Sequence, residues 1–472
     1  MNFATIQFIS FYVVVVCLYW SIPNRRLRKV LLLIASYYFY MSWNAKLVTL
    51  ILASTILDFT AGRVMARSAS QTRRTAALVA SCVGNLGLLA VFKYANFFAS
   101  SFQELVSLFG LTASPVELNI VLPVGISFYT FQTLSYTIDL YRRRLDPCHD
   151  FLDFALFVAF FPQLVAGPIV RARHFLPQLA IDHRWSWARL RSGLWRMLVG
   201  LAKKVVIADT LALTVDQVFA DPQQYGFALS WVGVVAFAFQ IYADFSAYSD
   251  IAIGAGRILG YDIPENFRHP YLATNVREFW QRWHISLSTW LRDYLYIPLG
   301  GSRGGSGATY RNLMTTMILG GLWHGASWTF VAWGLYQGGM LCLARLIGGA
   351  LGRPESPAAD GPLIRFGQIL FTFIITCFGW VLFRAETFGD AATIILSMVG
   401  AGNTDTSGTL RLSVLWVMGL VVLTHVLAAL REQDRFDWTR TLFVRAVVMT
   451  GCVLGILTFG RAHPSAFIYF QF

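Results

Sequence analysis

Charged residues are scarce in this chain of 472 residues: 13% are Asp, Glu, Lys or Arg, whereas 56% are hydrophobic. This balance excludes an ordinary soluble domain, in which about a quarter of the residues are charged. The six cysteines are scattered and form no C-x-x-C pair, so neither a zinc site nor a disulfide framework is indicated. Solenoid repeats and long linkers are also missing. We therefore expect one membrane-embedded domain over residues 1–472.

Long apolar runs, by contrast, recur from one end of the sequence to the other. A helix needs about 20 such residues to cross the hydrocarbon core of a bilayer. The runs lack the two-residue alternation of a membrane barrel, which leaves helices as the spanning form. We predict an all-α polytopic membrane protein with about ten to twelve spanning or re-entrant helices. The clearest runs are Ile6–Ile22, Thr75–Phe92, Ile120–Leu140, Phe151–Val170, Trp231–Ile253, Leu313–Ile347, Phe366–Phe383, Leu412–Leu430 and Phe443–Phe459.

The net charge of +13 would suggest nucleic acid as a partner in a soluble protein. In a membrane protein it reports the excess of Lys and Arg in cytoplasmic loops and contacts with anionic lipid. We therefore expect membrane lipid as a partner and no nucleic acid.

Two histidines are the first candidates for chemistry. His324 lies inside the apolar run Leu313–Ile347, where an ionisable ring is costly unless it faces a cavity, a partner or a substrate. His284 lies on a predicted amphipathic helix, Asn275–Pro298, with apolar residues at three- and four-residue spacing. The glycine-rich turn at residues 300–307 would let the chain fold back and bring the two rings together. The alternative is that His324 bonds a neighbouring helix and His284 is an interface residue.

Other polar residues interrupt the apolar helices. Asp244 requires a cation, a proton or water, because a central carboxylate costs about 2.5–3.5 kcal/mol on insertion scales. Gln and Ser positions also serve as ordinary contacts between helices, and this alternative stays open for them. We predict that the following residues line a wet tunnel: Gln132, Gln240, Asp244, Tyr248, Ser288 and Trp323.

Basic residues form a third candidate group, suited to the phosphates of a nucleotide-like donor on the cytoplasmic side. They are equally suited to anchoring the protein at the lipid surface. The predicted donor-binding residues are Lys203, Lys204, Arg277, Arg282 and Arg303. Serines lie near the histidines, but the sequence contains no G-x-S-x-G elbow or recognisable triad. Direct acyl transfer with histidine as base therefore fits the residues present better than an acyl-serine intermediate.

Several stretches together resemble one known family. They are EFWQRWHISLS (278–288), LRDYLYIPLGG (291–301) and GLWHG (321–325), supported by FPQLVAGPI (161–169) and YADFSAYSDIA (242–252). The chain resembles the membrane-bound O-acyltransferase family, in its bacterial branch that serves alginate O-acetylation. The similarity is densest over residues 122–337.

This resemblance implies a helical fold with a central tunnel, in the inner membrane of a bacterium. A cytoplasmic donor, acetyl-CoA, would meet an acceptor that arrives from the other face. His324 matches the family's catalytic histidine and would act as general base, while His284 would orient the reactants or polarise the carbonyl. Periplasmic partner proteins would pass the acetyl group to an exopolysaccharide of the alginate or cellulose type.

Four other functions remain open from the sequence. The same fold could transfer D-alanine to teichoic acid or acetylate peptidoglycan. His324 and Asp244 could instead relay protons in a coupled transporter, although no internal repeat supports it. A purely structural scaffold of a secretion complex would leave His324 unexplained.

Overall fold

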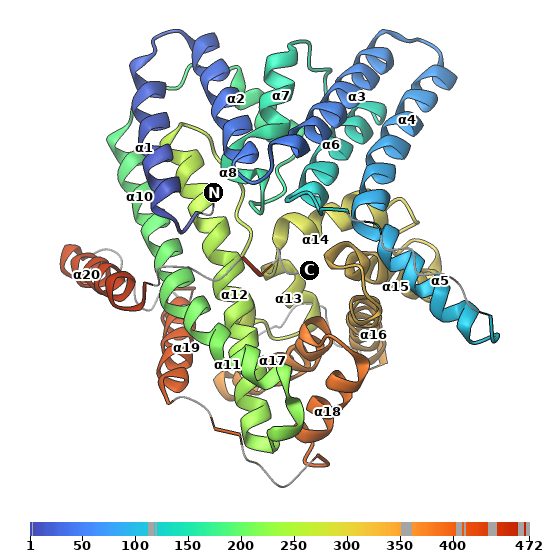
Figure 1. Cartoon of the computed structure of the whole chain (residues 1–472), viewed down its shortest axis with the longest axis vertical. Helices are drawn as coiled ribbons and strands as arrows, with labels where there is room; N and C mark the ends of the chain where they lie inside the picture. The colour runs from blue at the N-terminus through green and yellow to red at the C-terminus, as the bar shows by residue number, and fades with distance from the viewer. Residues whose placement is uncertain are drawn as a thin grey trace. The chain divides into compact units, whose positions relative to one another are not determined.

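The computed structural model describes residues 1, 3–111, 118, 120–350, 361–402, 408–409, 412–432, 441–460 and 467–468. Throughout these residues the regular structure is helical and contains no strand (Figure 1). The predicted all-α class is therefore confirmed. Six helical segments are long and apolar enough to cross a membrane: Ala45–Arg67, Gln71–Ser107, Phe227–Ile258, Trp328–Gly349, Pro362–Arg384 and Ser413–Leu430.

The chain forms two compact units, and the single domain over residues 1–472 stays a prediction. The first unit comprises Met1–Met197 and Ile251–Pro264. Within it α3, α4 and α6 pack against one another, and α2 packs against α7. Its helices are α1 (Ile6–Ser21), α2 (Arg25–Met41), α3 (Val48–Arg67), α4 (Gln71–Leu89), α5 (Ala95–Ser107), α6 (Ile126–Tyr141), α7 (Phe151–Ala159), α8 (Phe161–Leu164) and α9 (Ala172–Leu179).

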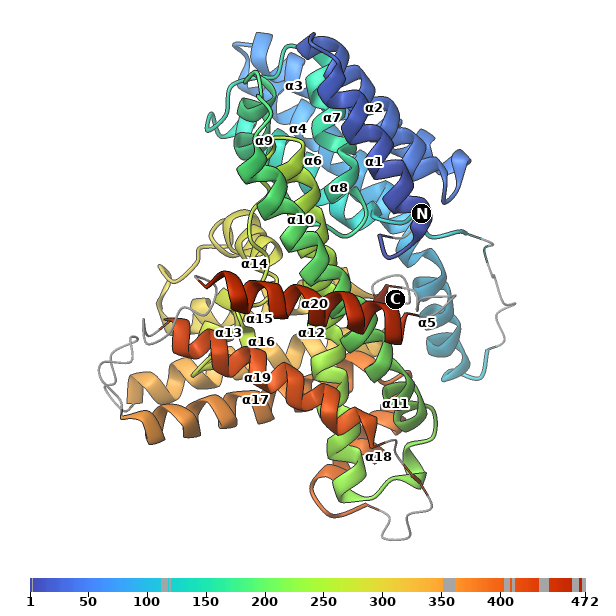
Figure 2. The ribbon, with the colours of Figure 1, turned by 90° about the vertical axis from the view of Figure 1, so that its left-hand side faces the viewer.

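The second unit comprises Leu198–Asp250 and Glu265–Phe472. Here α15 packs along α16, and α16 along α17. In Figure 2, α19 is the orange helix and α20 the dark red helix that run across the view. Its helices are α11 (Asp209–Ala220), α13 (Val276–Arg282), α14 (Ile285–Leu291), α15 (Gly305–His324), α16 (Trp328–Ala350), α17 (Pro362–Arg384), α18 (Phe388–Met398), α19 (Ser413–Glu432) and α20 (Leu442–Phe459).

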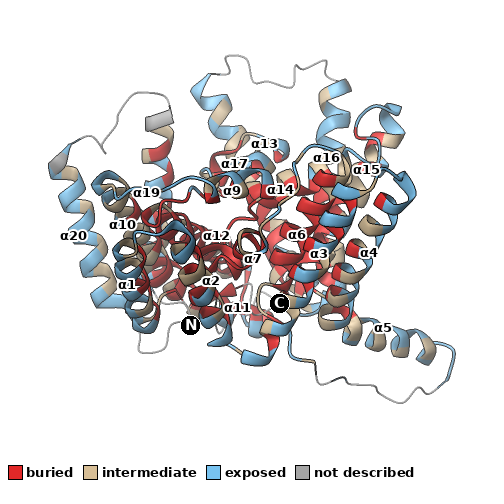
Figure 3. Ribbon diagram, turned by 90° about the horizontal axis from the view of Figure 1, so that it is seen from above, coloured by how far each residue is buried: buried red, intermediate tan, exposed pale blue. Residues whose placement is uncertain are grey.

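Two helices contribute residues to both units, α10 (Trp187–Ala202) and α12 (Phe227–Ile258). Most of α12 is buried, whereas α5 has no buried residue (Figure 3). Because α12 is shielded by protein along most of its length, it can carry polar side chains such as Asp244, which would be costly on a lipid-facing helix.

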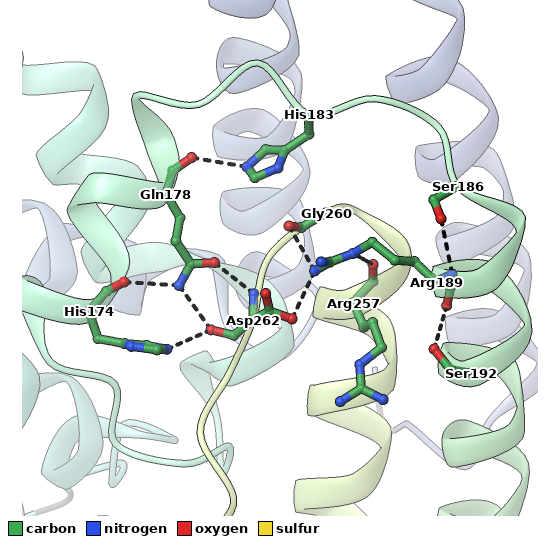
Figure 4. Close-up of polar contacts among 9 residues, drawn as sticks. All are labelled: His174, Gln178, His183, Ser186, Arg189, Ser192, Arg257, Gly260 and Asp262. Carbon is green, nitrogen blue, oxygen red and sulfur yellow. Dashed lines mark hydrogen bonds and ion pairs between the residues drawn. The ribbon is translucent and has the colours of Figure 1, made fainter.

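In the first unit, the turn that follows α12 is held by a network around Arg189 and Asp262 (Figure 4). The Arg189 guanidinium donates to the carbonyls of Arg257 and Gly260 and pairs with Asp262 at 2.8 Å. Gln178 accepts a bond from the Asp262 amide at 2.7 Å. These contacts satisfy carbonyls at the end of α12 that lack a partner within the helix, and they fix the chain just before it enters the candidate site.

Three segments predicted as continuous are interrupted helices in the structure. The run Phe151–Val170 is two short helices, because Pro162 opens a new helix after the break at Phe160. The run Leu313–Ile347 is α15 and α16, separated by Gly325–Ser327, so His324 ends a helix instead of lying inside one. The predicted helix Asn275–Pro298 is α13, α14 and a π-helix, Arg292–Tyr296.

Candidate active site

His284 occupies the break between α13 and α14. Its backbone has φ 41° and ψ 54°, the left-handed region that a non-glycine residue rarely adopts. The side chain of Asn275 caps the start of α13 by accepting from the Glu278 amide at 2.9 Å. The prediction that one continuous helix carries His284 is therefore wrong, because the backbone turns there. The side chain is fully buried.

Asn266 holds the imidazole of His284. The Asn266 side-chain oxygen lies 3.1 Å from His284 Nδ1, and it accepts from the amide and the hydroxyl of Ser286 at 3.2 and 2.8 Å. The Asn266 amide nitrogen donates to Ser249 on α12 at 3.2 Å. All four side chains are buried, and the bond from Asn266 therefore fixes the His284 ring on its Nδ1 side.

The backbone around this cluster is paired as well. The Arg268 amide donates to the Arg282 carbonyl, and the Ile285 amide donates to the Asn266 carbonyl, both at 2.9 Å. The loop that contains Asn266 is thus joined to the chain on both sides of His284. This pairing holds a left-handed histidine that would otherwise relax to a more common conformation.

His324 ends α15 and is 3% exposed. Three aromatic rings surround its imidazole: Trp323 and Trp333 at 5.1 Å and Phe383 at 5.3 Å between ring centroids. The C-terminal end of a helix carries partial negative charge. This charge favours the imidazolium that would form if His324 took up a proton.

The structure brings the two candidate histidines together, with ring centroids 6.4 Å apart. Phe245 of α12 packs its ring edge-on against His284 at 4.6 Å, and Trp323 lies 6.0 Å from the same ring. The pair therefore sits in a buried aromatic setting with little water, in which electrostatic interactions are stronger than in solvent. Their catalytic roles stay predictions.

Close packing of α15 against α16 places His324. A Cβ atom on Gly321 would come within 2.2 Å of the Phe330 carbonyl, and one on Gly334 within 2.4 Å of the Met317 carbonyl. Only glycine allows the two backbones to approach this closely.

Asp244 has a cation beside it, one of the three partners (a cation, a proton or water) predicted for it. Lys204 lies 2.8 Å from Asp244 and 3.0 Å from Asp209, and all three are buried. The second Asp244 oxygen accepts from the Ile468 amide at 2.7 Å. Phe467 beside it packs on Tyr248 at 4.4 Å. Segment 467–468 is therefore part of the packing around α12.

The other predicted tunnel residues lie in different surroundings. Gln240 and Tyr248 are buried on α12, and Trp323 is buried beside His324. Ser288 donates to the Trp283 carbonyl at 3.1 Å. Gln132 lies on α6 of the first unit and donates to the Phe157 carbonyl. That these residues line a tunnel stays a prediction.

The predicted donor-binding residues divide into two groups. Lys203 pairs with Asp250 at 2.7 Å, Lys204 bridges the two carboxylates described above, and Arg282 pairs with Glu278 at 2.9 Å. Arg277 and Arg303 are exposed. This internal pairing is not visible in the sequence, because the acidic partners of both lysines are separated from them in sequence or by a helical turn.

Sequence reasoning also missed Asn266, Phe467 and Ile468. Asn266 lies 18 residues before His284, in a loop without regular periodicity. Its only signal was its place in the polar stretch between α12 and α13. Phe467 and Ile468 gave no signal at all.

Comparison with known proteins gives one family match and several relatives that cover most of the chain. The model of the membrane-bound O-acyltransferase family matches residues 36–383. The chain is 39% identical to the probable alginate O-acetylase AlgI of Pseudomonas putida, over 96% of either protein. It is 42% identical to the AlgI of Pseudomonas aeruginosa, over 87% of this chain and 76% of the relative. It is 32% identical to the peptidoglycan O-acetyltransferase of Helicobacter pylori, over 94% of this chain and 91% of the relative.

The family model spans most of the chain, and these relatives match it along nearly its whole length. Apolar helices of spanning length occur in both compact units. The chain belongs to the membrane-bound O-acyltransferase family and is a multi-pass membrane O-acyltransferase.

Proposed function

We propose that this chain transfers the acetyl group of acetyl-CoA across a bacterial inner membrane for O-acetylation of an exopolysaccharide of the alginate or cellulose type. The observation that carries the proposal is the placement of His284 and His324 with their rings 6.4 Å apart in a buried aromatic setting. The similarity to proteins named alginate O-acetylase supports the choice of acetyl group and polysaccharide.

His324 is the general base of this reaction. It takes the proton of an acceptor hydroxyl as the hydroxyl oxygen attacks the thioester carbonyl carbon. A C–O bond forms, the C–S bond breaks, and the proton passes from His324 to the sulfur of CoA. The end of α15 stabilises the transient imidazolium, and the rings of Trp323, Trp333 and Phe383 enclose it.

The donor reaches this site from the cytoplasmic side. Arg277 and Arg303 are the best placed of the predicted residues to hold its phosphates, because both are exposed. Lys203, Lys204 and Arg282 already pair with carboxylates, which favours a role in holding the site together. A tunnel lined in part by α12 would exclude water from the thioester, and periplasmic partner proteins would receive the acetyl group.

Peptidoglycan is the second candidate acceptor, since a relative named peptidoglycan O-acetyltransferase is 32% identical over most of the chain. D-alanyl transfer to teichoic acid is the third. These candidates share the fold and differ in donor or acceptor.

The experiment is a donor and acceptor screen with the purified protein in lipid vesicles. Labelled acetyl-CoA and a D-alanyl carrier protein are offered separately, with oligosaccharides of alginate, cellulose or peptidoglycan and with the periplasmic partners. Acetyl transfer from acetyl-CoA to alginate or cellulose fragments supports the proposal. Transfer only to peptidoglycan fragments, or only of D-alanine, overturns it in favour of the corresponding alternative.

A further inference from the structure

The orientation of the Asn266 side chain is determined by its neighbours. The atom that faces the Ser286 backbone amide must be the oxygen, because a backbone N–H can only donate. The Asn266 nitrogen then faces the Ser249 hydroxyl, which can accept. No rotation of the amide by 180° satisfies both contacts, so the usual ambiguity between the two side-chain atoms is removed.

This orientation determines where His284 carries its proton. His284 Nδ1 lies 3.1 Å from the same Asn266 oxygen, which has no hydrogen to give. Nδ1 must therefore donate, and it bears the hydrogen of the neutral ring. Nε2 is then the nitrogen that holds the lone pair.

We propose that Asn266 is a positioning residue that fixes His284 as the Nδ1–H tautomer, so that His284 acts in acyl transfer as a hydrogen-bond acceptor and not as the donor that polarises the thioester carbonyl. This inference deepens the proposed function and rests on it for the role in transfer. It decides between the two roles that the sequence left open for His284.

The surroundings keep the ring in this form. Burial lowers the pKa of His284 to about 3, so the ring is neutral near pH 7 and cannot donate from both nitrogens. Phe245 packs edge-on against the ring at 4.6 Å and restricts its rotation. The backbone bonds from Arg268 to Arg282 and from Ile285 to Asn266 hold the asparagine in place.

The direct test is the ¹⁵N signature of the His284 ring by solid-state NMR of the full chain in lipid, with labelled histidine. The signal is assigned by its loss in His284→Gln. The proposal expects the hydrogen on Nδ1 in the wild type and in Asn266→Asp, which keeps an acceptor oxygen. Asn266→Ala removes that oxygen, and its His284 signal should show the Nε2–H form or a mixture. Asn312→Ala, which alters another buried asparagine that bonds the Gly301 carbonyl, should leave the signal unchanged.

Kinetics provide the second readout. Asn266→Ala should lower kcat for acetyl transfer by up to about 100-fold through misplacement of the ring, with KM for acetyl-CoA nearly unchanged, and Asn266→Asp should recover part of the loss. A wild-type ring protonated on Nε2 overturns the proposal, as does an Asn266→Ala protein with unchanged tautomer and kcat. If Asn266→Ala does not fold, the wild-type and Asn266→Asp spectra still show which nitrogen of His284 carries the hydrogen. Absence of acetyl transfer in the wild type would refute the proposed function. The NMR spectrum alone would still decide which nitrogen of His284 carries the hydrogen.

Discussion

His284 and His324 are both buried, yet their immediate surroundings differ. His324 ends a 20-residue helix, where partial negative charge favours a cation, and aromatic rings surround it. His284 Nδ1 lies 3.1 Å from the neutral amide oxygen of Asn266, and burial lowers the pKa of the His284 ring to about 3. One ring is therefore suited to accept a proton during transfer, and the other to remain neutral.

The pH dependence of stability tests the neutral state of His284. Burial lowers its pKa from 6.5 to about 3 in the folded chain. As the pH falls below 6.5, the unfolded chain binds a proton that the folded chain does not bind, so stability present above pH 6.5 is lost progressively toward pH 3. Thermal unfolding in detergent should show a shallower loss between pH 7 and pH 4 for His284→Gln than for the wild type. His149→Gln, at an exposed site, should keep the wild-type slope; equal slopes for all three proteins would show that His284 does not titrate in this way.

At this scale the sequence identified both histidines and the need of Asp244 for a cation, a proton or water. It did not identify Asn266, because hydrogen-bond partners across a loop leave no periodic pattern. It also gave no warning of the left-handed backbone at His284, where a glycine or asparagine would have signalled a turn. Tertiary bonds impose that conformation.

At the scale of elements, the contact between α15 and α16 positions the catalytic candidate. The sequence predicted one long apolar run over these two helices, because Gly325, Ala326 and Ser327 hardly lower its hydropathy. Glycines at 321 and 334 let the helices approach until a Cβ atom would meet backbone atoms of the partner helix. Such contacts depend on facing residues and are not visible in one helix taken alone.

Gly334→Ala should therefore displace α15. The added methyl group would lie 2.4 Å from the Met317 carbonyl and 2.9 Å from Ile318 Cα, neither of which can rotate away. We expect a loss of stability of about 1–3 kcal/mol from overpacking and a fall in acetyl transfer, measured by thermal unfolding and by CoA release. Gly339→Ala is the matched control on the same helix, since its Cβ meets nothing within 4 Å. Equal behaviour of the two variants would contradict this account of the helix contact.

At the scale of the whole molecule, composition was enough to predict an all-α membrane protein, since 56% of the residues are hydrophobic and 13% are charged. The two compact units were not predicted, because each consists of two separate stretches of the sequence and no linker divides them. Composition also says nothing of which positive charges are paired internally. The net charge of +13 includes lysines that lie inside the protein beside carboxylates.

Replacement of Lys204 separates the structural role from donor binding. Lys204→Met leaves Asp209 and Asp244 buried without their cation, and removal of one partner from a buried pair costs about 3–5 kcal/mol. We expect a low folded yield by size-exclusion chromatography and an unchanged KM for acetyl-CoA in the protein that folds. Arg303→Gln, at an exposed site, should fold normally and raise that KM. A well-folded Lys204→Met protein with a raised KM would instead place Lys204 at the donor.

The central claim is that His324 is the base of acetyl transfer. Its most direct measurement is CoA release and acetyl transfer from labelled acetyl-CoA by the protein in lipid with its periplasmic partners, comparing the wild type, His324→Ala and His149→Ala at equal folded yield. The account predicts full activity in the wild type and His149→Ala, and a fall of at least about 100-fold in His324→Ala, the scale expected for loss of a general base. Equal rates in all three proteins would contradict it.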